Sequence, residues 1–262
     1  MAIRKLNEGG IDTQSVFKDK NYITVIVHRV LSGKYQLLMM QRQPKGSIRG
    51  RLERDFTHYS KNAFKDVDAV LFSDHKLLLQ GDAVSSMLQS AGKAGVRTIA
   101  NVNSTNIWNY EGADVIRVNS SEASIATGIK HINETSIRNM GLEIISKTRS
   151  LGVLIAWIDD GANLFGRDNF YSSIPSSGYE PSELTGIGDI MASVLTAGLM
   201  LGIDLLKASK LAYYAASYYA SRGERKFLSP EDLDMVIGDG LKGQRLLPSG
   251  RSLGDDANVS LD

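Results

Sequence analysis

Residues 96–122, VRTIANVNSTNIWNYEGADVIRVNSSE, contain the pattern that decides the fold. Two short apolar runs, VRTIANVN (96–103) and ADVIRVN (113–119), each end in polar residues. Short apolar runs of this kind are typical of strands buried in a parallel sheet. We therefore predict two buried strands here, followed by a helix over about 121–130.

The same pattern continues on both sides of this stretch. Further strands are predicted at DAVLFSD (68–74) and VLIAWID (153–159). Helical spacing of apolar residues predicts helices over 82–94, 121–130, 135–150, 189–201 and 204–221. Strands that alternate with helices in this way favour an α/β fold, a mainly parallel sheet with helices on both faces.

Residues 22–42 do not fit this alternation. The runs YITVIVHRV and YQLLMMQR lie on either side of Ser32-Gly33-Lys34 and predict a β-hairpin. We interpret this hairpin as an added flap or lid.

Length and composition suit one large domain. The chain has 262 residues, of which 42% are hydrophobic and 23% charged, enough for a substantial core. Ser229-Pro230-Glu231-Asp232 predicts the capped start of a last helix. We expect the domain to span residues 1–237 and residues 238–262 to form a loose polar tail.

Charge and composition also exclude several classes of function. The net charge of +1 gives no overall field that would attract nucleic acid or an anionic membrane. The basic cluster KGSIRGRLER (45–54) is interpreted as a solvated loop. No P-loop motif, cysteine, apolar signal core or membrane-length apolar run is present. We expect a cytoplasmic protein without a nucleic-acid or membrane partner.

Polar residues at the carboxyl ends of the predicted strands are the first candidates for a site, because open α/β sheets bind ligands there. They are Ser73, Asp74, Asn101, Asn103, Asn119 and Glu122. Asp74 and Asn103 could each be turn residues. Asn119 and Glu122 have the spacing of a capping box, but their oxygens could also hold Mg²⁺ through water.

The stretch TGIGD (185–189) places Asp189 after a glycine turn at an expected helix start. A helix N-terminus offers free N–H groups and partial positive charge, and glycines allow a phosphate to approach closely. A carboxylate there suggests a second task, such as taking a proton from a hydroxyl that attacks phosphorus. The alternative is a first-turn aspartate that stabilises the helix dipole.

The order of these motifs along the chain indicates a family more specifically than any single motif does. Over about residues 8–237, the chain resembles the ribokinase-like (PfkB) family of carbohydrate kinases. The resemblance lies in the order of a strand ending SD, a strand ending N-x-N, ADVIRVNSSEAS, TGIGD and SRGERKFLSPEDL. Within this family, the chain is most similar to the kinase domain of heptose-7-phosphate kinases, on the stretches GIDTQSVFKD and DVDAVLFSDH and on the hairpin.

The resemblance implies an ATP-dependent kinase that acts on a sugar or sugar phosphate, with ATP and Mg²⁺ as cofactors. Asp189 corresponds to the family's catalytic base. The backbone of Gly186, Ile187 and Gly188 corresponds to its anion hole for the transferred phosphoryl group. The hairpin matches the lid that covers the sugar.

The resemblance also implies further contacts with ligands. Asn119 and Glu122 match the N-x-x-E magnesium motif of the family. Asn103, Thr185 and Asn119 are implied to contact the nucleotide or its phosphates, and Asp74 is implied to contact the substrate.

Departures from the family leave alternatives open. The chain has no Gly-Gly-x-x-x-Asn stretch, which in the family follows an N-terminal strand. Asn101 replaces an aspartate, Ile187 replaces a small residue, and Tyr213 stands where an asparagine is common. We expect a central strand to be missing, and a partner chain or a homo-oligomer to complete the sheet, because unpaired backbone groups are costly when buried. The alternatives to an active kinase are a kinase-like subunit with a structural or regulatory role and one half of a split kinase.

Overall fold

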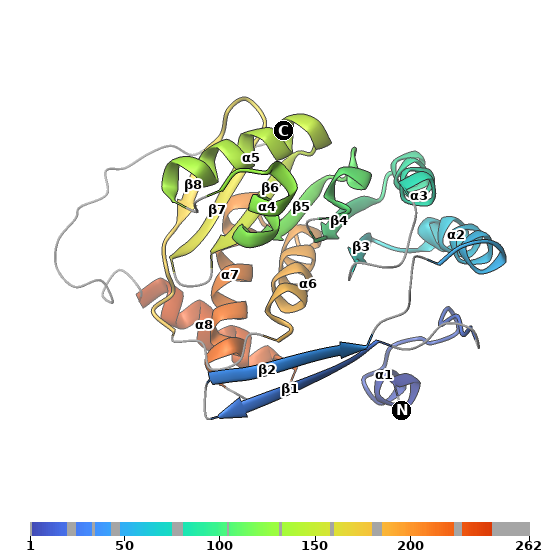
Figure 1. Ribbon diagram of the computed structural model, residues 1–262, viewed down its shortest axis with the longest axis horizontal. Coiled ribbons are helices and arrows are strands. Elements are labelled where there is room, and N and C mark those ends of the chain that lie inside the picture. Colours follow the sequence, from blue (N-terminus) through green and yellow to red (C-terminus); the bar gives the residue numbers. More distant parts are fainter. Residues whose placement is uncertain are drawn as a thin grey trace.

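A computed structural model gives the fold of the chain (Figure 1). The residues that it describes are 2–19, 25–32, 35–42, 48–74, 81–103, 105–130, 133–157, 160–179, 185–222 and 227–242. The strands are β1 (Ile26–Ser32), β2 (Tyr35–Arg42), β3 (Ala69–Ser73), β4 (Arg97–Asn101), β5 (Val115–Asn119), β6 (Gly152–Trp157), β7 (Gly161–Gly166) and β8 (Tyr171–Ile174). The helices are α1 (Ala2–Glu8), α2 (Arg51–Ala63), α3 (Gly81–Ala94), α4 (Ser120–Thr127), α5 (Glu134–Thr148), α6 (Ile187–Met200), α7 (Leu205–Ser221) and α8 (Pro230–Lys242), with short 3₁₀ helices η1 (Phe64–Asp66) and η2 (Ile107–Tyr110).

The described strands after the hairpin form one six-stranded sheet in the order β3-β4-β5-β6-β7-β8. The four predicted strands, β3 to β6, pair in parallel. β7 and β8 extend the sheet with antiparallel pairing. The predicted α/β fold with a mainly parallel sheet is therefore confirmed, while β7 and β8 are additions that the sequence pattern does not predict.

Helices cover both faces of this sheet (Figure 1). On one face, α3, α4 and α5 enclose a buried cluster that includes Ile116 and Val118. On the other face, α6 and α7 enclose a second cluster that includes Val115 and Leu195. Side chains alternate along a strand, so β5 supplies both clusters and directs Arg117 towards α6.

The predicted hairpin is also present. β1 and β2 pair antiparallel and form a sheet of their own, separate from the six-stranded sheet. Gly33 and Lys34 of its predicted turn lie outside the described residues. Val27, Leu37 and Met39 are exposed by 45%, 67% and 48%, so the hairpin is not part of the main core.

β3 lies at the margin of the sheet. Within the described ranges its strand neighbour is β4, and most of its residues are only partly buried. The six strands pair in unbroken order, so the described sheet has no gap at its centre. Among the described residues, β3 and β8 each pair with one strand, so these are the two edges at which another strand could pair.

The last described helix, α8, begins at Pro230 as predicted and continues to Lys242. The expected start of the tail at residue 238 thus falls inside α8, and residues 243–262 lie outside the described residues. Among the helices that the structure describes, none has both the length and the apolar character needed to cross a membrane.

Candidate functional site

The predicted site residues around TGIGD lie where α6 begins against β3, β4 and β5. Gly186 is the N-cap of α6 and has φ 84°, a left-handed conformation that favours glycine. As a glycine, this N-cap residue has no side chain that could accept from the first N–H groups of the helix. Helix N-termini carry unpaired N–H groups, so this turn has the backbone donors that an anion hole requires.

Asp189 is held from two strand ends. Ser73 at the end of β3 donates its hydroxyl to Oδ1 of Asp189 at 2.7 Å. Asn101 at the end of β4 donates its Nδ2 hydrogen to the same oxygen at 3.0 Å. The carboxylate is therefore oriented by neighbours that are distant in sequence, which a simple first-turn aspartate would not need.

A buried arginine completes this arrangement. Arg117, in β5, is 5% exposed and donates from Nη1 to Oδ1 of Asn101 at 3.1 Å. Burial lowers the pKa of Arg117, and the nearby carboxylates of Glu122 and Asp189 oppose this shift. Arg117 is not among the residues predicted from the sequence, although a charged residue inside the apolar run DVIRVN was a usable signal.

Gly186 and Gly188 are each required to be glycine, for different reasons. Gly186 supplies the positive φ, whereas an ideal Cβ on Gly188 would lie 2.5 Å from Nη1 of Arg117. Ile187 is 4% exposed and belongs to the core between the sheet and α6 and α7. Its bulky side chain is therefore directed into the core.

Asn119 and Glu122 form the capping box at the start of α4. The Glu122 N–H donates to Oδ1 of Asn119 at 2.7 Å, and the Asn119 N–H donates to Oε2 of Glu122 at 2.9 Å. This confirms the capping alternative, and the magnesium role stays a prediction. The described residues contain no group of three or more His, Cys, Asp or Glu side chains that could hold a metal ion. Mg²⁺ commonly uses one or two carboxylates with waters and substrate phosphates, so these oxygen donors fit a water-mediated role.

Asp74 and Asn103 lie in a separate hydrogen-bond network that organises the loop after β4. Asp74 Oδ2 accepts from the hydroxyl of Tyr110 at 3.0 Å and from Nδ2 of Asn106. Asn103 donates from Nδ2 to the backbone oxygen of Asp74 at 3.0 Å. Burial, together with the charge of Asp74, raises the pKa of Tyr110 above its usual range. The ligand contacts of Asp74 and Asn103 stay predictions.

The hairpin reaches the glycine turn. Arg29 in β1 donates from Nη1 to Oγ1 of Thr185, directly before Gly186. On the α7 side, the hydroxyl of Tyr219 would lie 3.4 Å from a Cβ on Gly186. Tyr213, another departure from the family, is 1% exposed and forms part of the core.

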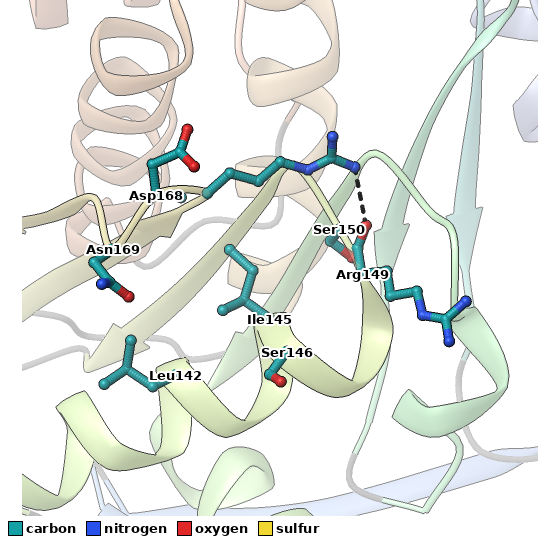
Figure 2. Close-up of a pocket in the computed structure, with 9 residues that line it drawn as sticks. Leu142, Ile145, Ser146, Arg149, Ser150, Asp168 and Asn169 are labelled. Carbon is teal, nitrogen blue, oxygen red and sulfur yellow. Dashed lines mark hydrogen bonds between the residues drawn. The ribbon is translucent and has the colours of Figure 1, made fainter.

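A separate hollow of about 580 Å³ lies beside the end of α5 (Figure 2). Leu142 and Ile145 line it from α5, and Arg167 donates to the backbone oxygen of Arg149 at 3.3 Å. These residues flank the start of β6 and the end of β7, whereas Asp189 lies at the carboxyl ends of β3 and β4. None of the predicted site residues lines this hollow.

The sequence matches a family and several relatives. The family model "pfkB family carbohydrate kinase" matches residues 1–231. The "Bifunctional protein HldE" of Citrifermentans bemidjiense is 26% identical over 91% of this chain and 49% of the relative. The protein of the same name from Trichlorobacter lovleyi is 22% identical over 90% of this chain and 48% of the relative. The chain thus spans about half the length of these curated relatives.

The fold is also similar to solved structures. A putative phosphofructokinase from Staphylococcus aureus has a TM-score of 0.69 at 14% identity, covering 90% of this chain and 75% of that one. Phosphofructokinase-2 from Escherichia coli has a TM-score of 0.64 at 13% identity, covering 77% of this chain and 66% of that one. Similarity at these identities shows a shared fold.

Proposed function

The chain belongs to the pfkB family of carbohydrate kinases, and on that premise we propose that it transfers the γ-phosphoryl group of ATP to a hydroxyl of a sugar or sugar phosphate. The observation that carries this proposal is the environment of Asp189. Its carboxylate lies in the first turn of a helix whose N-cap is a glycine in the left-handed conformation. Ser73 and Asn101 hold the same carboxylate from the ends of two strands.

In the proposed reaction, Asp189 accepts the proton of the acceptor hydroxyl as its oxygen attacks the γ-phosphorus. The new oxygen–phosphorus bond forms while the bond to the β-phosphate oxygen breaks, and ADP leaves. The N–H groups at the start of α6 stabilise the negative charge of the transferred group, because fixed donors cost no reorganisation during the reaction. Positioning and charge stabilisation of this kind account for most of the catalysis in phosphoryl transfer.

Asn119 and Glu122 are the residues that we propose to hold Mg²⁺ through water. Bound Mg²⁺ would neutralise phosphate charge. The hairpin is proposed to cover the acceptor, since Arg29 in β1 already contacts Thr185 beside the glycine turn. Asn103 and Thr185 remain the proposed contacts to the nucleotide or its phosphates.

The test is ATP·Mg²⁺ binding by calorimetry, followed by ADP release with a panel of sugars and sugar phosphates that includes heptose 7-phosphate and fructose 6-phosphate. Asp189→Asn is expected to abolish turnover while ATP still binds. Asp82→Asn is the matched control, because Asp82 is an exposed first-turn aspartate of α3. Turnover that Asp189→Asn leaves intact would reject the mechanism. Binding without turnover of any acceptor would favour the kinase-like subunit instead.

We also propose that the chain self-associates or binds a partner chain. The free edge of β3 and the exposed apolar residues of the hairpin support this proposal. Light scattering on the purified chain is the test. A monodisperse monomer with a cooperative unfolding transition would contradict it.

A further inference from the structure

Arg117 is a buried charge that the fold does not explain. Its side chain leaves the middle of β5 towards α6, and the residue is only 5% exposed. Its Nε has no hydrogen-bond partner among the described residues. Replacing a buried ion by an apolar side chain of similar volume is often neutral or stabilising. Stability alone therefore does not account for an arginine at this position.

The contacts of Arg117 lead directly to Asp189. Oδ1 of Asn101 accepts from Nη1 of Arg117 at 3.1 Å, and Nδ2 of Asn101 donates to Asp189 at 3.0 Å. An amide has one accepting end and one donating end. Because the guanidinium occupies the accepting end, the donating end must meet the carboxylate. The ionised carboxylate, which only accepts hydrogen bonds, favours the same orientation of the amide, so Arg117 and Asp189 together fix Asn101.

The first turn of α6 packs against the guanidinium of Arg117. An ideal Cβ on Gly188 would lie 2.5 Å from Nη1 of Arg117 and 3.4 Å from Oδ1 of Asn101. The absence of a side chain at this position lets the charge of Arg117 lie beside the backbone of the first helical turn. The cation is therefore next to the turn at which the negative phosphoryl group is proposed to bind.

Both carboxylates of the predicted motifs interact with the same cation, since Glu122 and Asp189 each act electrostatically on Arg117. Two other titratable side chains approach this turn within the described ranges. Arg29 reaches it from the hairpin through Thr185, and Tyr219 approaches Gly186 from α7. Arg117 is the buried one of the two arginines near the turn.

We propose that Arg117 is a positioning residue for Asp189: through Asn101 it fixes the orientation of the catalytic carboxylate, and its positive charge lies beside the turn that carries that carboxylate. This inference rests on the proposed kinase function. The hydrogen bond of Arg117 is made to Asn101 and not to Asp189 itself, so removing Arg117 should lower kcat and leave the KM for ATP nearly unchanged.

The experiment compares Arg117→Met, which has a long apolar side chain without charge, with Arg117→Lys, which keeps the charge. Arg97→Met is the control, because Arg97 is exposed at the start of β4. We expect Arg117→Met to lower kcat about 10- to 100-fold, less than the loss of about 100- to 1,000-fold seen when a donor to the reacting centre is removed, because Arg117 acts through Asn101. Its KM for ATP should change less than about twofold, the pattern of an interaction made in the transition state. Arg117→Lys should recover most of the loss.

A second readout does not require turnover. The titration of the Asp189 carboxyl carbon is followed by NMR in the full chain, with Asp189→Asn to assign the signal. Loss of the cation should raise the pKa of Asp189 in Arg117→Met, because a nearby positive charge favours the ionised form. Arg117→Lys should leave the pKa close to that of the original chain.

The two readouts separate failure of this inference from failure of the proposed function. If the original chain phosphorylates no acceptor, the kinase function fails, and the NMR titration still decides the role of Arg117. If Arg117→Met folds, turns over normally and leaves the Asp189 pKa unchanged, the inference is wrong. If Arg117→Met does not fold, Arg117→Gln, which keeps a polar donor, makes the same comparison.

Discussion

The guanidinium of Arg117 occupies the space that a side chain at position 188 would need: an ideal Cβ on Gly188 would lie 2.5 Å from Nη1 of Arg117. Gly188 lies inside the helical turn, and its φ is not in the left-handed region. Its requirement for glycine therefore comes from a neighbouring side chain. By contrast, Gly186 has φ 84° and is required by its own backbone conformation.

This relationship makes Gly188→Ala a sharp test of the packing at the start of α6. We expect overpacking to lower the free energy of unfolding by about 1–3 kcal/mol, measured by urea denaturation. Gly92→Ala is the matched control, because Gly92 lies in helix α3 with open space around a Cβ. That control should gain about 0.5–1 kcal/mol from helix propensity.

Combining Gly188→Ala with Arg117→Met should recover part of the loss, since residues in contact are not additive. Additive losses in the double variant would show that the methyl group does not meet the guanidinium.

Ser73 is predicted to orient Asp189 through one hydrogen bond of 2.7 Å. Ser73→Ala removes that donor and leaves Asn101 in place. We expect kcat to fall about 3- to 10-fold, which corresponds to a net hydrogen-bond contribution of about 1 kcal/mol. Steady-state kinetics on an acceptor identified from the panel is the measurement. An unchanged kcat would mean that the hydrogen bond from Ser73 is not needed to orient the carboxylate.

Two similar capping boxes allow the capping and metal roles of Asn119 to be separated. Asn119 caps α4 beside the site, and Asn133 caps α5 with an equivalent reciprocal pair of hydrogen bonds. Each substitution to Ala should cost about 0.5–2 kcal/mol of stability. If Asn119 helps to hold Mg²⁺, only Asn119→Ala should also raise the Mg²⁺ concentration needed for half-maximal activity. Equal Mg²⁺ requirements for both variants would leave Asn119 with its capping role alone.

The contact between Arg29 and Thr185 predicts a functional coupling between the hairpin and the glycine turn. Arg29→Met keeps the length of the side chain and removes the donor. We expect faster hydrogen exchange in β1 and β2 and a higher KM for the acceptor, with little change in ATP binding. Arg42→Met, also in the hairpin and exposed, is the control. Identical exchange in both variants would contradict a lid held by Arg29.

Elements that depend on local patterns could be predicted from the sequence. The hairpin, the strands β3 to β6 and the helix starts at Asn119 and Ser229 follow from short apolar runs, turn residues and capping spacing. β7 and β8 could not be predicted in this way, because GANLFG and YSSI have little β-branched character. They become strands by pairing with β6 and with each other. Helix α1 was not predicted either.

The sequence by itself determined the α/β order and placed Asp189 in a glycine turn, because strand, helix and turn signals act over a few residues. Tertiary structure alone decided what holds Asp189. Ser73, Asn101 and Arg117 come from three neighbouring strands, and Ser73 is 116 residues from Asp189 along the chain. Contacts at that separation depend on how α6 packs across the strand ends, and no local pattern specifies this packing. The same packing decided that Gly188 makes room for a buried arginine.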